Sequence, residues 1–126
     1  MTPYGMGASL LALILGGGMV YALAANDMRA IDGDTVALGR ERVRLAGIAC
    51  PELKQPGGLT AKLALQSMLH GELRVERLGQ DRYDRTVGRL FANGRDLGCQ
   101  MIQSGHCRRW AKFDPAGIYK NCHKAP

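Results

Sequence analysis

The chain has 126 residues, of which 46% are hydrophobic and 22% charged, so it is neither a wholly disordered chain nor a collagen-like repeat. Its length allows one small domain. It excludes a large α/β enzyme, because an α/β barrel or a doubly wound sheet needs about twice as many residues. All 17 Lys and Arg and all 11 Asp and Glu lie at or after Asp27, so this part carries the whole formal charge of +6. Such a charge suits a polyanion, either nucleic acid or an anionic membrane face, although it also serves solubility alone.

The first 25 residues differ from the rest of the chain. Met6–Ala25 contains no charged residue, and Ala22-Leu23-Ala24 offers a small-x-small cleavage site. We therefore divide the chain into a leader over residues 1–25 and a domain over residues 26–126. The leader is a cleaved signal peptide or an uncleaved anchor, and a third alternative makes part of Val20–Ala25 a buried first strand. The first two alternatives predict a protein that is periplasmic, extracellular, or anchored in a membrane and facing outside the cytoplasm.

The domain shows alternating strands, two helical segments and strong turn signals. Thr35–Leu38 and Glu41–Ile48 alternate between the two faces of a strand, and a short hairpin joins them. Leu59–His70 has helical spacing, with Thr60 as a candidate N-cap. The other predicted elements are strands over Leu73–Leu78 and Thr86–Ala92, a turn at Asn93-Gly94, and a helix capped by Asp96 that runs to Ser104. This order predicts a mainly β, α+β fold built on a small closed or partly open barrel.

The cysteines favour an oxidising compartment. Cys50, Cys99, Cys107 and Cys122 form an even set in a domain of about 100 residues, which predicts two disulfides with three possible pairings. The chain has no Cys-x-x-Cys spacing and three histidines, which argues against a zinc site.

Four short segments carry groups suited to phosphodiester hydrolysis. They are Ile31–Thr35, Val43–Leu45, Pro51-Glu52 and Asp81–Arg85. Arg44 and Arg85 supply guanidinium forks for the negative charge of the transition state. Asp34 offers hard oxygen atoms to a divalent cation, and Glu52 can orient or deprotonate a water molecule. Taken singly, each segment is also typical of a turn, a solvated charge or an exposed loop.

In this order and at these spacings, the four segments resemble the staphylococcal nuclease-like (thermonuclease) family over about Ala30 to Trp110. The resemblance implies a five-stranded OB-fold barrel with an inserted helix. It also implies a Ca²⁺-assisted phosphodiesterase that acts on DNA and RNA with little sequence preference.

The resemblance also assigns roles to individual residues. It implies that Asp34 binds the metal, that Arg44 and Arg85 bind the phosphate, and that Glu52 activates water. Two further positions near the metal match supporting residues of the family, and these are Asp32 and Thr35. The backbone carbonyl of Cys50 can contribute one more oxygen ligand.

Two departures from the family pattern bear on activity. Ala49 stands where the family has a second metal-ligand aspartate, so we expect weaker Ca²⁺ binding, another metal preference or a site without turnover. Asp84 stands where glycine is usual, and it places a carboxylate beside Arg85. The alternatives to a nuclease are a catalytically impaired nucleic-acid-binding module, and an envelope protein that binds other proteins with the same barrel.

The resemblance also bears on the cysteines. It implies that Cys50 ends a barrel strand and that Cys107 follows the second helix beside it. We therefore expect one disulfide between Cys50 and Cys107 and another between Cys99 and Cys122.

Aromatic residues supply candidate contacts to bases. Tyr83 and Tyr119 are candidates to stack on single-stranded DNA or RNA, with core packing as the equal alternative, whereas core packing is the favoured interpretation of Trp110. We expect a monomer that meets a membrane only if its leader stays uncleaved. The sequence does not identify a protein partner.

Overall fold

The computed structural model describes residues 11–15, 18–22 and 27–126. The strands are β1 (Leu11–Leu15), β2 (Gly18–Ala22), β3 (Met28–Asp32), β4 (Thr35–Leu38), β5 (Glu41–Leu45), β6 (Ile48–Ala49), β7 (Leu73–Gln80), β8 (Thr86–Ala92), β9 (Arg95–Asp96) and β10 (Arg108–Arg109). The helices are α1 (Gly58–Met68), α2 (Leu97–Gln103) and the short 3-10 turn η3 (Ala111–Phe113).

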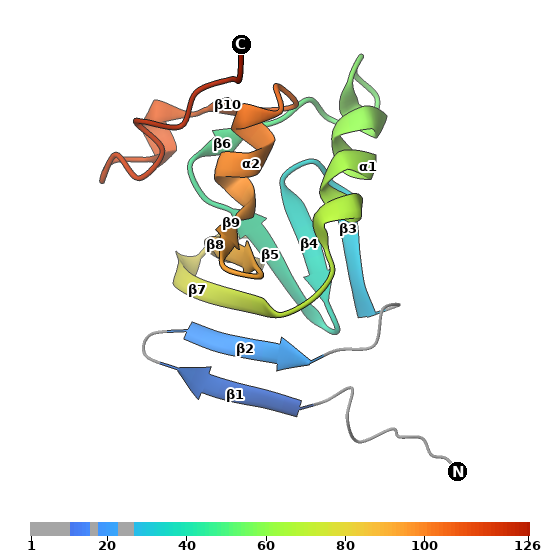
Figure 1. The fold of residues 1–126 in the computed structure, drawn as a ribbon, viewed down its shortest axis with the longest axis vertical. Coiled ribbons are helices and arrows are strands. Elements are labelled where there is room, and N and C mark those ends of the chain that lie inside the picture. Colours follow the sequence, from blue (N-terminus) through green and yellow to red (C-terminus); the bar gives the residue numbers. More distant parts are fainter. Residues whose placement is uncertain (1–10, 16–17, 23–26) are drawn as a thin grey trace.

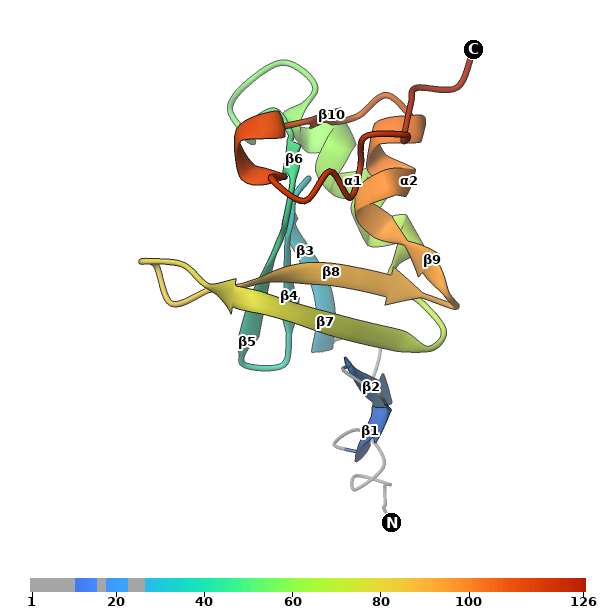
Figure 2. The same cartoon turned by 90° about the vertical axis from the view of Figure 1, so that its left-hand side faces the viewer.

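The strands form one mixed sheet in the order β1-β2-β7-β8-β5-β4-β3, with β9 on β8, while β6 pairs with β10 separately. β5 runs parallel to β8 and antiparallel to β4. In Figures 1 and 2, β7 and β8 cross the layer of β3, β4 and β5, and α1 and α2 cover one end. The order β7-β8-β5-β4-β3 is that of an OB fold, which confirms the expected α+β architecture. Within the described residues β3 does not pair with β7, so the barrel is partly open.

The strand expected over Glu41–Ile48 is divided in two, so that prediction is wrong. A turn at Ala46-Gly47 separates β5 from β6, and Gly47 has a φ of +75°, which glycine adopts without strain. A Cβ atom at Gly47 would also lie 2.9 Å from the ring of Tyr119. The turn frees β6 to leave the main sheet and pair with β10.

The two helices begin differently. α1 follows Gly57, which has a φ of +85° and makes no side-chain cap, so the expected N-cap at Thr60 is wrong because Thr60 lies inside the helix. α2 begins as expected, since the Asp96 carboxylate accepts hydrogen bonds from the backbone N–H groups of Gly98 and Cys99.

The core lies between the sheet and the inner faces of the two helices. Its fully buried aliphatic side chains come from both halves of the chain: Val36, Val43, Leu45, Ile48, Leu65, Leu73, Val75, Leu90, Leu97 and Met101. Burial of each such side chain stabilises the fold by about 1.5–3 kcal/mol. The Gln66 side chain joins α1 to β3, because it accepts from Ala30 N at 2.8 Å and donates to Met28 O at 3.2 Å.

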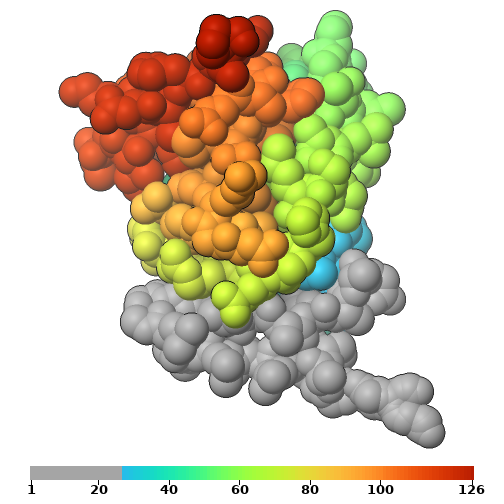
Figure 3. All heavy atoms as spheres, in the orientation of Figure 1, coloured from blue at the N-terminus to red at the C-terminus, as the bar shows by residue number. Residues whose placement is uncertain are grey.

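Both expected disulfides are present. Cys50 is bonded to Cys107, which joins the end of β6 to the start of β10, and Cys99 is bonded to Cys122, which joins α2 to the C-terminal segment. Figure 3 shows the residues after α2 gathered against that helix.

A buried carboxylate organises the C-terminal segment. Asp114 is 4% exposed, and it accepts hydrogen bonds from Arg109 Nε at 2.8 Å, Ile118 N at 2.7 Å and Tyr119 N at 2.9 Å. Burial opposes ionisation, but the bond from Arg109 and the two N–H groups hold the pKa of Asp114 below its ordinary value. The charged carboxylate therefore stabilises the turn that follows η3.

At the N-terminal end, β1 and β2 form an antiparallel hairpin, and β2 pairs with β7. β2 overlaps the first strand that was one alternative for Val20–Ala25. The expected cleavage site extends into residues 23–26, which lie outside the described residues, and the leader stays a prediction. No helix in the described part of the chain is long and apolar enough to cross a membrane.

Candidate active site

The Asp-Gly-Asp-Thr turn between β3 and β4 forms one wall of the site. Asp32 Oδ1 accepts from Asp34 N at 3.0 Å, and the Thr35 hydroxyl donates to Asp34 Oδ1 at 3.0 Å. A Cβ atom at Gly33 would lie 2.8 Å from Ala61 Cβ and 3.0 Å from Cys50 Cβ, so glycine lets the turn pack closely against α1 and the disulfide. These bonds orient the Asp34 carboxylate toward β5.

Arg44 on β5 is held by three groups. Its Nη2 atom lies 3.4 Å from Asp34 Oδ2 and donates to Ile48 O at 3.0 Å, and Nη1 donates to the Leu45 carbonyl. The Arg44 side chain is 16% exposed. A guanidinium has five N–H donors, so these contacts fix the group while leaving donors for an anion.

Asp34 and Arg44 form a partly buried pair with unusual titration. Burial raises the pKa of Asp34 to about 6, Arg44 opposes that rise, and the nearby Asp32 adds to it. The Asp34 carboxylate therefore gains or loses its charge around pH 6, above the range of an ordinary aspartate.

Arg85 comes from the loop between β7 and β8, which Asp81 organises. Asp81 Oδ2 lies 2.8 Å from Arg85 Nε, and Asp81 Oδ1 accepts from the backbone N–H groups of Tyr83 and Arg85. Burial opposes ionisation, yet the N–H groups of Arg85 and Tyr83 hold the pKa of Asp81 below its ordinary value. The partner of Arg85 is thus Asp81 and not Asp84, the neighbour suggested by the sequence. Asp84 instead has a φ of +61°, which explains why glycine suits this position.

The two arginines line one open pocket of about 600 Å³. The parallel pairing of β5 with β8 brings them together, because Arg44 is opposite Val87 and Arg85 immediately precedes β8. Trp110 and Phe113 also line this pocket, with ring centroids 4.3 Å apart in an edge-to-face arrangement. The pocket therefore combines two guanidinium groups with two aromatic rings.

Aromatic exposure corrects two expectations from the sequence. Tyr119 was a candidate to stack on bases, but it is 1% exposed, and its hydroxyl donates to the Asp96 carboxylate at 2.8 Å. Trp110 was expected in the core, but it is 36% exposed. Phe113, 51% exposed, was missed, although the aromatic pair three residues apart after the second helix is a usable signal.

Tyr83 stays a candidate for base contacts, since it is 55% exposed and lines the pocket. The guanidinium groups of Arg82 and Arg85 lie over its ring at 5.0 and 5.3 Å from the centroid. Its backbone carbonyl accepts from Arg42 Nη2 at 3.0 Å, which ties the loop to β5.

Glu52 lies in the exposed loop between β6 and α1. Gln55 closes this loop, because Gln55 Oε1 accepts from Glu52 N and Gln55 N donates to Glu52 O, each at 2.8 Å. Glu52 does not line the pocket that contains Arg44 and Arg85. Its loop nevertheless follows directly from β6, whose Ile48 carbonyl accepts from Arg44.

The donor set falls short of a Ca²⁺ site. Ca²⁺ takes six to eight oxygen ligands, with several carboxylates among them. This site offers Asp32 and Asp34, Ala49 supplies no carboxylate, and Arg44 already neutralises Asp34. Among the residues that the structure describes, no three His, Cys, Asp or Glu side chains are grouped to hold a metal. Metal dependence, and the ligand role of the Cys50 carbonyl, therefore stay predictions.

Comparison with known proteins gives a consistent result. A family model described as staphylococcal nuclease homologue matches residues 42–124. The chain is 36% identical over 83 residues to the probable staphylococcal-like nuclease CAN1 of Oryza sativa subsp. japonica, covering 65% of this chain and 25% of that protein. It is 33% identical over 88 residues to the staphylococcal-like nuclease CAN1 of Arabidopsis thaliana, covering 69% and 27%. It is 30% identical over 94 residues to an uncharacterized endonuclease of Haemophilus influenzae, covering 70% and 53%. The chain thus spans about a quarter of the plant relatives and about half of the bacterial one.

Proposed function

Because the chain belongs to the staphylococcal nuclease homologue family, we propose that it is a nuclease that hydrolyses phosphodiester bonds in DNA and RNA. The observation that carries the proposal is the pocket shared by Arg44 and Arg85 beside an exposed aromatic pair. Two guanidinium groups suit a phosphate, and aromatic rings suit unstacked bases whatever their identity. This combination favours flexible single strands and little sequence preference.

In the proposed reaction, Arg44 and Arg85 bind the scissile phosphate and neutralise the charge that develops on its oxygens. Glu52 accepts a proton from a water molecule as the water oxygen bonds to phosphorus. The bond from phosphorus to the leaving oxygen breaks, and that oxygen takes a proton from solvent. The exposed Glu52 carboxylate supports this role, since it makes no hydrogen bond or ion pair within the described residues.

We further propose that any metal dependence is weak or altered. Ala49 removes a carboxylate from the position where the family binds its metal, and Asp34 is already paired with Arg44. A divalent cation that binds here would polarise the phosphate oxygen, and Asp32, Asp34 and Thr35 are the residues that would hold it.

A cleavage assay on single-stranded DNA tests the proposal. The full chain with both disulfides formed is incubated with Ca²⁺, Mg²⁺, Mn²⁺ or EDTA, beside the variant Glu52→Gln. Loss of a general base lowers the rate by about 10²–10⁴-fold, so cleavage by Glu52→Gln is expected to fall in that range. The matched control is Glu72→Gln, an exposed glutamate in the turn before β7, which is expected to leave cleavage unchanged.

Equal cleavage by Glu52→Gln and Glu72→Gln would remove Glu52 from the reaction. No cleavage by the unmodified protein under any condition, with oligonucleotide binding intact, would refute the nuclease proposal.

The second candidate function is a nucleic-acid-binding module without turnover. Ala49 favours it, because this substitution removes the family's second metal-ligand carboxylate while retaining both arginines. If Ala49→Asp gives Ca²⁺-dependent cleavage and the unmodified protein gives none, the binding module is the correct alternative.

We propose that the protein works in an oxidising compartment, as an exported or membrane-anchored protein. The two disulfides support this proposal, since such bonds are rare in reducing cytosol.

A further inference from the structure

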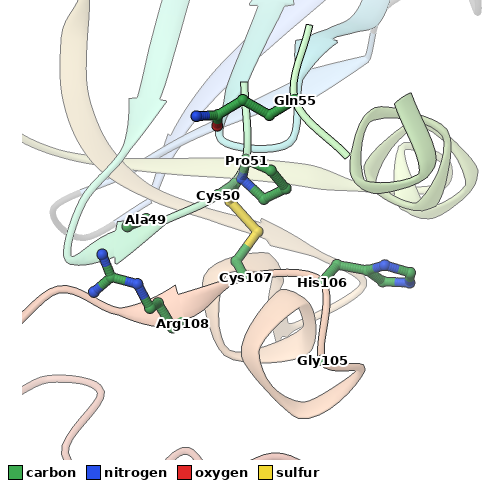
Figure 4. A pocket seen from close by; sticks show the side chains of 8 residues that line it. All are labelled: Ala49, Cys50, Pro51, Gln55, Gly105, His106, Cys107 and Arg108. Atoms are coloured by element: carbon green, nitrogen blue, oxygen red, sulfur yellow. A yellow bond between two sulfur atoms is a disulfide. The ribbon is translucent and has the colours of Figure 1, made fainter. Parts of the chain in front are cut away.

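A second cavity lies beside the Cys50–Cys107 disulfide, on the edge formed by β6 and β10. It measures about 400 Å³, within the range of small-ligand pockets. Its eight lining residues are Ala49, Cys50, Pro51, Gln55, Gly105, His106, Cys107 and Arg108. None of these eight is acidic, and Figure 4 shows Arg108 and His106 on either side of the disulfide.

Arg108 stands opposite Ala49. The two residues are direct partners in the antiparallel β6–β10 pair, so their side chains share one face. Figure 4 shows the Arg108 guanidinium beside the Ala49 methyl group. An aspartate at position 49 would neutralise this guanidinium, whereas alanine leaves its charge available to a ligand.

Arg108 also differs from neighbouring arginines in that no carboxylate among the described residues is paired with its guanidinium. Arg109 on the same strand pairs with Asp114, and Arg44 pairs with Asp34. Arg108 is exposed and makes no ion pair within the part of the chain that the structure describes. A guanidinium of this kind binds phosphate in two-pronged geometry.

The cavity adjoins the candidate active site. Both cysteines of the disulfide line it, and Cys107 Sγ lies 3.8 Å from Gly33 O in the Asp-Gly-Asp-Thr turn. Ile48, the residue before Ala49, receives a hydrogen bond from Arg44. Gly47 lines the Arg44 pocket and Ala49 lines the Arg108 cavity, so the two cavities meet within three consecutive residues at β6.

We propose that the cavity beside the Cys50–Cys107 disulfide is a second phosphate subsite for the nucleic-acid strand, with Arg108 as its anion-binding residue. It binds a backbone phosphate neighbouring the one held by Arg44 and Arg85, so the substrate crosses β6 between the two cavities. This inference rests on the proposed function, since it needs a polynucleotide in the Arg44 pocket.

The salt dependence of binding tests the subsite. Affinity for fluorescent oligothymidylate of about 12 nucleotides, within the span of one OB fold, is measured by anisotropy in EDTA at several salt concentrations. Each phosphate contact to a single strand contributes a slope of about −0.7 to log K against log salt. Arg108→Ala is expected to make the slope less negative by about 0.7, and Arg108→Lys is expected to restore it. Ala49→Asp is expected to act as Arg108→Ala does, because its carboxylate pairs with Arg108.

The matched control is Arg95→Ala. Arg95 is also an exposed arginine without an ion pair among the described residues, but it lies beyond the opposite end of α2. It is expected to leave the slope unchanged.

Three results overturn the proposal. An unchanged slope in Arg108→Ala removes the contact, and an equal change in Arg95→Ala shows general surface charge instead. If the unmodified protein does not bind the oligonucleotide at all, the nucleic-acid function fails and the subsite fails with it.

Discussion

Removal of the Cys50–Cys107 disulfide is expected to destabilise the fold more than removal of the Cys99–Cys122 disulfide. The bonded residues are 57 positions apart in the first case and 23 in the second. The loop-closure model gives about 4.2 kcal/mol for the longer loop and about 3.4 kcal/mol for the shorter one at 25 °C. Because a small domain is stable by about 5–15 kcal/mol, either loss is a large fraction of the total.

The two disulfides also differ in what they support. Cys50–Cys107 contacts Gly33 in the turn that carries Asp34, and Cys50 precedes the loop that carries Glu52. Cleavage measured below both unfolding temperatures is therefore expected to fall in Cys50→Ala/Cys107→Ala. It should be retained in the double variant of the other pair, which fastens the end of the chain to α2.

The assay is urea denaturation of the two double-alanine variants and the unmodified protein, followed by circular dichroism, with cleavage measured on the same samples. A change in the midpoint with a constant slope reports stability. Equal or reversed free-energy losses would refute the loop-length reasoning. Retained cleavage in the folded Cys50→Ala/Cys107→Ala variant would refute the link between this disulfide and the site.

Three further predictions follow from individual side chains. The raised pKa of Asp34 means that, between about pH 4 and pH 6, the folded protein binds a proton that the unfolded chain has released. The free energy of unfolding should therefore fall as pH rises through this range. Asp34→Asn should flatten this part of the profile of urea midpoint against pH. Asp84→Gly should stabilise the protein by up to about 1 kcal/mol, because the backbone there has a φ of +61°, and an unchanged or lower thermal midpoint would contradict this. Tyr119→Phe removes the hydroxyl donor to Asp96 and should lower the free energy of unfolding in urea by about 1–3 kcal/mol, while changing oligonucleotide affinity little. Loss of oligonucleotide binding in the folded variant would instead show that Tyr119 takes part in binding nucleic acid.

The fold was predictable where local pattern and tertiary structure agree. Thr35–Leu38 and Thr86–Ala92 alternate clearly, and both are strands with the expected bounds. The division between β5 and β6 was not predictable from alternation, because the pattern continues through Gly47. The turn there depends on the positive φ of Gly47 and on the close approach of the Tyr119 ring. The strand β10 is two residues long, too few for an alternating pattern, and it was not predictable because it is defined by its pairing with β6 next to the Cys50–Cys107 disulfide.

The candidate site was predictable in its charges but not in its partners. Ordered motifs indicated Arg44 and Arg85, and both line one pocket. The partner of Arg85 depends on the loop geometry that Asp81 imposes, and this could not be read from the adjacent Asp84. The buried Tyr119 hydroxyl finds its acceptor in Asp96, a residue 23 positions away that the sequence indicated only as a helix cap.

The parallel β5–β8 pair has a consequence for folding kinetics. Arg44 and Arg85 belong to segments far apart in the chain, and they become neighbours only when Val43 pairs with Thr86. Contacts of high sequence separation form slowly, because the loop between them must be closed first. In a chain that has formed only its local hairpins, the two arginines are therefore still apart, and they can bind one phosphate together only after β5 has paired with β8.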